Sequence, residues 1–253
     1  MKIINKITKI GLILLGIGII LGLIASVTLK QSFFEVISYN SPHQKTTSSK
    51  KQEGIIPNEN IAEIELNFEV SEINIKHTDD NKIAYEYHST QENELRVEIE
   101  ERTLSLENNV GSTDLFGFDA KSSTFILYLP KSKKYDLEIK TKVASTIISD
   151  VSLSSLDINS DVGEVSLTNI KILDELKVIS NVGAIEITNL REPKEVELEN
   201  NVGEIKIKNM YTKKVEIESN VGTISFINDD LDYKITYLSI NSKTGNKTIK
   251  VGQ

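Results

Sequence analysis

Histidines and acidic residues are the side chains of this sequence that could carry out catalysis or hold a metal ion. His77 and His88 lie in two alternating segments, with Asp79 and Asp80 in the turn between them. An imidazole near a carboxylate is a common arrangement for acid–base catalysis and for zinc binding. The spacing of these four residues matches no ligand signature, so we interpret both histidines as solvated residues at strand edges.

Two groups of glutamates offer a second kind of chemistry. The stretch 98–101, Glu-Ile-Glu-Glu, is an acidic cluster that could attract Ca²⁺, but the sequence has no Asp-x-Asp-x-Asp-Gly loop and no glycine-rich nonapeptide repeat. Glu164 and Glu204 share one column of the repeat described below, and cleavage of a polysaccharide would need several converging acids. Ala184 and Thr223 interrupt that column. The sequence therefore predicts no catalytic residue, no cofactor and no metal ion.

The composition excludes further classes of function. The chain has 253 residues and no cysteine, so it can form no disulfide and has no thiolate nucleophile. No G-x-S-x-G motif or phosphate-binding loop is present. The net charge is −8, and the first thirty residues hold four lysines and no acid, so the remainder carries −12. Because nucleic acid requires a basic surface, we expect no nucleic-acid binding.

Residues 10–29 are predicted to form one transmembrane helix. They lie between Lys9 and Lys30, carry no charge, and as a helix would span about 30 Å, the thickness of a bilayer core. A cleaved secretory signal is the alternative, but the apolar region is long and no small-x-small pair ends it. Three lysines precede the span and only one follows closely, which predicts a cytoplasmic N-terminus at residues 1–9.

Residues 30–58 are predicted to be a juxtamembrane segment and linker. The stretch from Ser38 to Gly54 is polar, contains Pro42 and shows no apolar periodicity. The remaining residues, 59–253, would then form one extracytoplasmic domain close to the cell membrane.

That domain contains an internal repeat of about twenty residues, clearest over residues 156–228. Each copy has a corner of the form Asp-Val-Gly or Asn-Val-Gly. The corner glycines, spaced 20, 20 and 19 residues apart, are Gly163, Gly183, Gly203 and Gly222. The polar residues two positions earlier are Asp161, Asn181, Asn201 and Asn220.

Each copy reads as strand, corner, strand, because apolar residues alternate with polar ones on both sides of the glycine. Glycine supplies positive φ at the corner, Asn or Asp bonds local backbone, and the valine between them is expected to point inward. One copy buries too little apolar surface to offset its loss of conformational entropy, so copies must stack. The pattern predicts an all-β chain folded as a single β-solenoid. A leucine-rich repeat, the competing fold, would need a helical segment where a second alternating strand follows.

The residues that carry a family resemblance are the segments 61–87 and 128–145 together with the Asn-Val-Gly-x-Ile coils. They resemble the DUF4097 family of β-strand-repeat proteins over roughly residues 60–251. Ser71 and Ala144 depart from its pattern by replacing a corner glycine. The resemblance implies a single β-solenoid without an established catalytic site. It also implies a candidate adhesin, in a family that includes membrane-anchored bacterial proteins of cell-envelope stress systems.

The predicted function is binding rather than catalysis. We expect a single-pass membrane protein, held in lipid by residues 10–29, whose solenoid is an accessory of an envelope stress system and contacts an envelope or membrane-protein partner. The alternative is an adhesin whose partner is a glycan or wall polymer. Phe116 and Phe118 lie in an expected insertion loop, residues 111–124, and are the predicted partner contacts.

Overall fold

The computed structural model describes residues 50–89, 95–108, 123–229 and 235–251. The regular secondary structure of these residues is all β, as predicted, and comprises nineteen strands. None of the described residues belongs to a helix long and apolar enough to cross a membrane. The predicted transmembrane segment, residues 10–29, lies outside the described residues.

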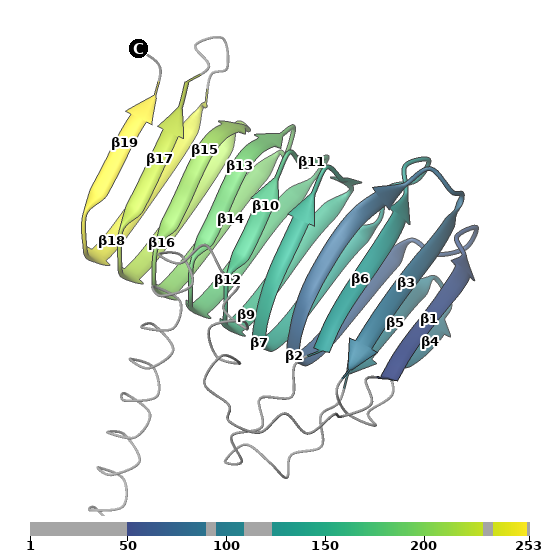
Figure 1. Ribbon diagram of the computed structural model, residues 1–253. Helices are drawn as coiled ribbons and strands as arrows, with labels where there is room; N and C mark the ends of the chain where they lie inside the picture. The colour runs from purple at the N-terminus through teal and green to yellow at the C-terminus, as the bar shows by residue number, and fades with distance from the viewer. Residues whose placement is uncertain (1–49, 90–94, 109–122, 230–234, 252–253) are drawn as a thin grey trace, which may run out of the picture. The chain divides into compact units, whose positions relative to one another are not determined.

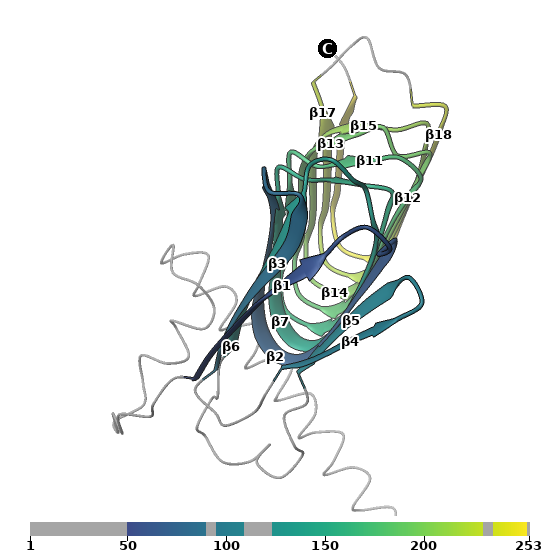
Figure 2. The same ribbon diagram turned by 90° about the vertical axis from the view of Figure 1, so that its right-hand side faces the viewer.

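The β-solenoid predicted from the repeat is confirmed, with about six turns of about twenty residues each. Two stacks of parallel strands form its long sides, and Figure 2 shows the coils one behind another. Sheet 1 contains the first halves of β2 (Glu63–Thr78) and β7 (Asp136–Ser149), then β9 (Ser155–Val162), β12 (Glu175–Val182), β14 (Glu195–Val202), β16 (Lys214–Val221) and β18 (Tyr237–Thr244).

Sheet 2 is built from the other half of each coil (Figure 1). It contains the second halves of β2 and β7, then β10 (Val165–Thr168), β13 (Ile185–Arg191), β15 (Ile205–Tyr211), β17 (Ile224–Asn228) and β19 (Lys247–Val251). The short strands β8 (Ser152–Leu153) and β11 (Lys171–Ile172) pair with each other where the chain returns to sheet 1. Because β2 and β7 run round the corner, they join the two sheets.

Equivalent residues of successive coils lie side by side. Leu156 is in register with Leu176, and Leu176 with Val196, at the strand spacing of about 4.8 Å. The degenerate early copies obey the same register, because Ser71 of β2 pairs with Ala144 of β7. Every position of the repeat thus becomes a column of side chains that runs along the solenoid.

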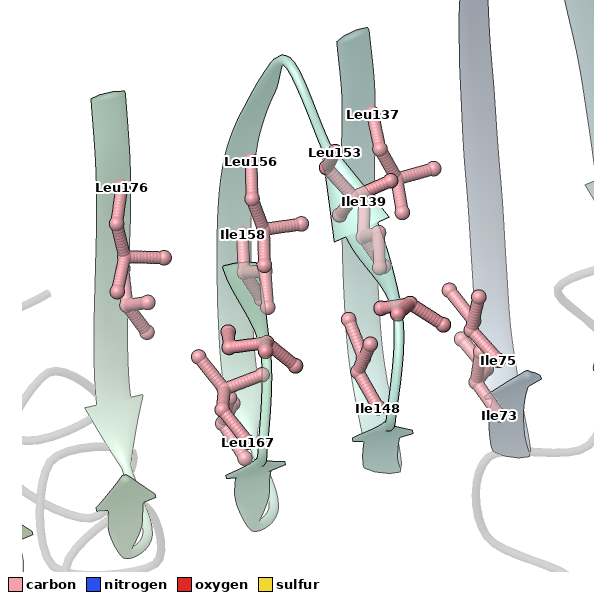
Figure 3. Packing of buried hydrophobic residues seen from close by; sticks show 14 of the residues in the cluster. Ile73, Ile75, Leu137, Ile139, Ile148, Leu153, Leu156, Ile158, Leu167 and Leu176 are labelled. Atoms are coloured by element: carbon pink, nitrogen blue, oxygen red, sulfur yellow. The ribbon is translucent and has the colours of Figure 1, made fainter. Parts of the chain in front are cut away.

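The apolar columns face inward and form the core. In β9, Leu156 and Ile158 are buried while the intervening Asp157 is exposed. Figure 3 shows Leu137, Leu156 and Leu176 at the same position of neighbouring coils. Each side chain therefore packs against the coil on either side, which is the burial that a single coil lacks.

The corner admits only glycine in the later coils because the preceding coil occupies the space of a side chain. Gly183 and Gly203 have φ of 153° and 145°, and a Cβ on them would lie 1.6 Å and 1.8 Å from the carbonyl oxygen of the preceding corner glycine. Ser71 and Ala144 occupy this position in β2 and β7, where the strand continues through the corner without positive φ.

The expected inward orientation of the corner valines is wrong. Val221 is 49% exposed, and its equivalents Val182 and Val202 are only half-buried. The interior at this level is taken instead by a small polar residue two positions earlier, such as Ser180 or Ser219, which is almost fully buried.

Shorter, partly antiparallel strands close the N-terminal end of the solenoid. In sheet 1, β5 (Thr103–Asn108) lies parallel to β2 and β4 (Arg96–Glu100) is antiparallel to β5. In sheet 2, β6 (Ser123–Pro130) lies parallel to β2, β3 (Lys82–Ser89) is antiparallel to β6, and β1 (Lys50–Pro57) is antiparallel to β3.

Side chains complete this closure. The Gln52 amide exchanges two hydrogen bonds with the backbone of Leu95, Nε2 donating to the carbonyl at 3.0 Å and Oε1 accepting at 3.1 Å. Behind it, Phe68, Tyr87 and Phe125 fill the first coils and are almost fully buried. β1 lies wholly inside residues 30–58, which the sequence analysis assigned to the juxtamembrane segment and linker, so the described sheet starts before residue 59. The polar residues of β1 are tolerated because it is an edge strand.

The C-terminal end has no such closure among the described residues. β18 and β19 each pair on one side only, and the core-facing Leu238 and Ile249 are 36% and 48% exposed. Lys247 replaces the core-facing Ile224 of the preceding coil, and its Nζ donates to the Ile240 carbonyl at 3.1 Å. The lysine side chain therefore crosses the end of the core, and inward charges of this kind protect free strand edges from pairing.

Replacing Gly203 by alanine should shift the denaturation midpoint strongly downward, by an amount equivalent to more than about 2 kcal/mol, because the new Cβ meets backbone that cannot move alone. Thr223→Ala, at an exposed position next to the following corner, is the matched control. Urea denaturation followed by circular dichroism measures both, and equal midpoints would refute the close approach at the corner.

Replacing Lys247 by isoleucine should promote association through the C-terminal end, because the barrier charge is replaced by apolar surface next to two free strand edges. Lys250→Ile removes the same charge from an outward position of the same strand and should associate less. Light scattering over a concentration series measures the mass of each variant. Identical association of the two variants would contradict a guarding role for Lys247.

Candidate functional site

The predicted corner residues form a polar row beside the glycines. Asp161, Asn181 and Asn201 are exposed on successive coils, and Asn220 follows on the next. Asn181 Nδ2 donates to Asp161 Oδ1 at 2.9 Å, and Asn220 Nδ2 donates to Asn201 Oδ1 at 2.8 Å. No hydrogen bond links Asn181 with Asn201 in the described coils, so the row consists of two separate pairs.

A second polar ladder, which the sequence analysis missed, lies at the end of sheet 2 that is away from the glycine corner. Asp150, Asn169, Asn189 and Asn209 all have φ between 54° and 58°, a conformation that Asn and Asp tolerate better than other side chains. Each asparagine donates its Nδ2 to the residue one coil earlier, at 2.8–3.1 Å. The sequence signal for this ladder is an Asn or Asp followed by a large apolar residue, which recurs at about the same spacing as the glycines.

The candidate catalytic His77 is held by the backbone on both sides of its ring. The Ser152 N–H donates to Nε2 at 2.8 Å, so Nδ1 carries the proton and donates to the Leu129 carbonyl at 3.0 Å. Both ring nitrogens are thus occupied, and the imidazole joins β2 to β6 and to β8. The half-buried His77 therefore has a structural role, whereas the sequence analysis predicted a solvated histidine at a strand edge.

His88 and Asp79 have partners of their own, and Asp80 is exposed. His88 Nε2 lies 3.8 Å from the Glu86 carboxylate, and Asp79 pairs with Lys131 at 2.7 Å. These contacts run in different directions and do not assemble the acid–base or metal site that the residue types could have formed.

In the acidic stretch 98–101, Glu98 makes a local contact, because it pairs with Arg96 at 2.6 Å.

A tighter acidic group lies elsewhere: the carboxylates of Glu63, Glu65 and Glu138 lie within 4.8 Å of one another across β2 and β7. Hydroxyl groups of β5 donate to the two β2 glutamates at 3.1 Å, and Lys140 pairs with Glu138 at 2.6 Å. Each of the three carboxylates therefore has a partner within the chain. Sequence reasoning missed it because the strands are about seventy residues apart.

Glu164 and Glu204 lie in one column, as predicted, with Ala184 between them. Two strand spacings separate them, about 10 Å. Lys206 Nζ lies 2.9 Å from the Glu204 carboxylate, whereas Glu164 has no ion pair. Burial, and secondarily the nearby Glu186, raises the pKa of the Glu164 carboxyl. The two acids do not converge on a common point.

The outer faces of the two sheets differ strongly in charge. On sheet 1 the outward carboxylates of the strands from β2 to β16 are Glu63, Glu65, Glu69, Asp136, Glu138, Asp157, Asp161, Glu175, Glu195, Glu197, Glu199, Glu216 and Glu218, and the outward lysines are Lys140, Lys142, Lys177 and Lys214. The equivalent residues of sheet 2 are Glu72, Glu164, Glu186 and Glu204 with Lys76, Lys206 and Lys208. Sheet 1 therefore carries most of the negative charge, and sheet 2 is nearly neutral.

Comparison with protein families matches residues 61–253 to the family described as "Toastrack DUF4097". The chain belongs to the DUF4097 family. The resemblance inferred from the glycine corners and the segments before them is thereby confirmed. A comparison with curated proteins finds no match.

Thirteen chains of solved structures also match this DUF4097 protein. One is a candidate cell adhesion protein from Clostridium sporogenes, with 14% identity and a TM-score of 0.46, covering 81% of this chain and all of that chain. Another is a candidate adhesin from Bacteroides fragilis, with 16% identity and a TM-score of 0.45, covering 81% and 99%. A third is a candidate lipid-binding protein from Parabacteroides distasonis, with 13% identity and a TM-score of 0.32, covering 79% and 96%.

The predicted partner contacts, Phe116 and Phe118, lie outside the described residues, and their role stays a prediction.

Replacing Glu164 by glutamine should stabilise the DUF4097 domain at pH 7. The pKa of Glu164 is higher in the folded than in the unfolded chain, so its favourable contribution exists at low pH and is lost as pH rises through the folded pKa. The variant should therefore melt above the wild type at pH 7 and equal it below about pH 4, where the carboxyl is protonated in both states. Glu175→Gln, at an exposed position, is the control; a pH-independent difference would contradict the assignment.

Proposed function

We propose that this DUF4097 protein is a membrane-anchored extracytoplasmic module that binds a partner and does not catalyse a reaction. The described part of the chain supports binding because it presents two broad faces of side-chain columns on a continuous hydrogen-bonded frame. The residues with the chemistry for catalysis are engaged in separate structural contacts, as His77 and Glu204 illustrate.

The observation that carries the proposal is the unequal charge of the two faces. Thirteen carboxylates face outward on sheet 1 against four lysines, whereas sheet 2 presents nearly balanced charges. A surface with this field attracts a basic partner and repels anionic wall polymers. The favoured partner is therefore a basic surface of an envelope or membrane protein, and sheet 1 is the docking face.

The location that we propose for the module rests on the sequence of its N-terminal segment. The uncharged residues 10–29 would anchor the module in lipid with its N-terminus in the cytoplasm. The solenoid would then lie close to the extracytoplasmic surface of the cell membrane. The family resemblance points to an accessory of a cell-envelope stress system. Phe116 and Phe118 are the proposed apolar contacts.

Crosslinking of the full-length protein in its own membranes, followed by mass spectrometry, tests the proposal. We expect one defined protein with a basic extracytoplasmic surface. The double substitution Glu175→Lys and Glu216→Lys on sheet 1 should abolish its capture, and replacement of residues 111–124 should weaken it.

The matched control is Glu72→Lys with Glu186→Lys, which makes the same charge change on sheet 2 and should leave capture intact. Equal loss in both variants would contradict docking through sheet 1. Capture of glycan or wall material without any protein would favour the adhesin alternative and overturn the proposed partner.

A further inference from the structure

A column of small polar side chains runs through the interior of the solenoid beside the glycine corner. Each coil contributes the inward residue three positions before its corner residue, and strand pairing places these residues in register. In coil order the members of this interior column are Thr141, Ser160, Ser180, Asn200, Ser219 and Ser242.

The members of the interior column are buried without satisfying their oxygen atoms. Ser160, Ser180 and Ser219 are 1%, 1% and 3% exposed, and none of their hydroxyl groups has a hydrogen-bond partner in the described coils. Oδ1 of Asn200, which is 2% exposed, also lacks a partner. Buried polar groups are nearly always hydrogen-bonded, and bound water commonly completes those that protein atoms leave unsatisfied. The recurrence of the same unpaired group in one column indicates one common cause.

Asn200 shows which contact is available at this level of the interior. Its Nδ2 donates to the carbonyl oxygen of Gly183, the corner glycine of the preceding coil, at 2.9 Å. Within the described coils no backbone N–H donates to this carbonyl, nor to the equivalent carbonyls of Gly163 and Gly203. The serines are too short to make the contact that Asn200 makes, so the Gly163 and Gly203 carbonyls lack the donor that Gly183 has.

Asn200 also shows how much room this level of the interior offers. The corner glycines from Gly163 to Gly222 have φ between 144° and 153°, so the backbone path repeats from coil to coil. An asparagine has two more non-hydrogen atoms than a serine, and Asn200 fits into this frame almost fully buried. A serine in the same frame therefore leaves space of about the size of one water molecule, roughly 30 Å³.

We propose that the interior column binds a row of water molecules, one in each serine coil. Each water donates to the corner carbonyl of the preceding coil, as the Asn200 amide does. Hydroxyl groups of adjacent coils, such as those of Ser160 and Ser180, lie about one strand spacing apart, roughly 4.8 Å, so one water between them reaches both at hydrogen-bond distance. Each water then has three partners, the number typical of buried water.

A metal ion is a poorer occupant than water. The interior column contains no charged side chain, and a buried charge requires a counter-charge. The row depends neither on the membrane anchor nor on docking of a protein through sheet 1.

A crystal structure of the full-length protein in detergent, at a resolution that shows ordered water, tests the row directly. We expect a water within about 3.2 Å of both Ser180 Oγ and the Gly163 carbonyl oxygen. In the variant Ser180→Asn the new amide should occupy that position and donate to the same carbonyl. A Ser180 hydroxyl bonded to backbone with no water beside it would overturn the proposal, as would a metal ion in place of the water.

Thermal melting of two variants of nearly equal side-chain size tests the same site in solution. Ser180→Asn should raise the melting temperature by about 2 °C or more, because the amide replaces the hydrogen bond of the water and releases the water. Ser180→Leu fills the same space without a donor and should lower it, because the Gly163 carbonyl then stays unpaired. Equal losses in both variants would show that the site has no room, and equal gains would show a dry apolar space. Either result would overturn the bound water.

Discussion

The close contact between the backbones of successive coils at the glycine corner is the constraint on which the rest of this structure depends. A Cβ at Gly183 or Gly203 would fall less than 2 Å from the carbonyl oxygen of the coil before it. This contact holds consecutive coils at the strand spacing in both sheets at once. The corner therefore fixes the register, and the register decides what every other side chain meets.

Register converts a local sequence pattern into properties of a whole surface. Because one position of the repeat becomes one column, a preference for Leu, Ile or Val at that position produces an uninterrupted core. The same rule produces the polar row beside the glycines, the asparagine ladder at the other end of sheet 2 and the acidic face of sheet 1. Within such a column an opposite charge relieves part of the repulsion between acids, as Lys177 does by pairing with Glu197 at 3.0 Å. Charge on this protein is thus organised by stacking and cannot be judged one residue at a time.

The sequence predicts the features that recur in every coil, but it does not predict the structure at the ends of the solenoid, where the repeat stops. The solenoid, its inward columns and the corner glycines follow from alternation and a fixed period, because both are visible within a few coils. The ends depend on single contacts between distant residues, such as Gln52 with Leu95, and a polar strand like β1 carries no alternation to reveal it. The Glu63, Glu65 and Glu138 group is hidden for the same reason. The second ladder was predictable, since Asn169, Asn189 and Asn209 share the period of the glycines.

Deviations from the repeat consequently show where the backbone path or the surroundings of a column change. A solenoid can extend any column from coil to coil, so a position that breaks its column carries a local reason. Lys247 interrupts an apolar column at the last coil, where the core would otherwise face solvent. Ser71 and Ala144 interrupt the glycine column in the first coils, where β2 and β7 continue through the corner without positive φ. The first deviation is explained by the end of the fold itself, and the second by the backbone path of the two strands that join the sheets.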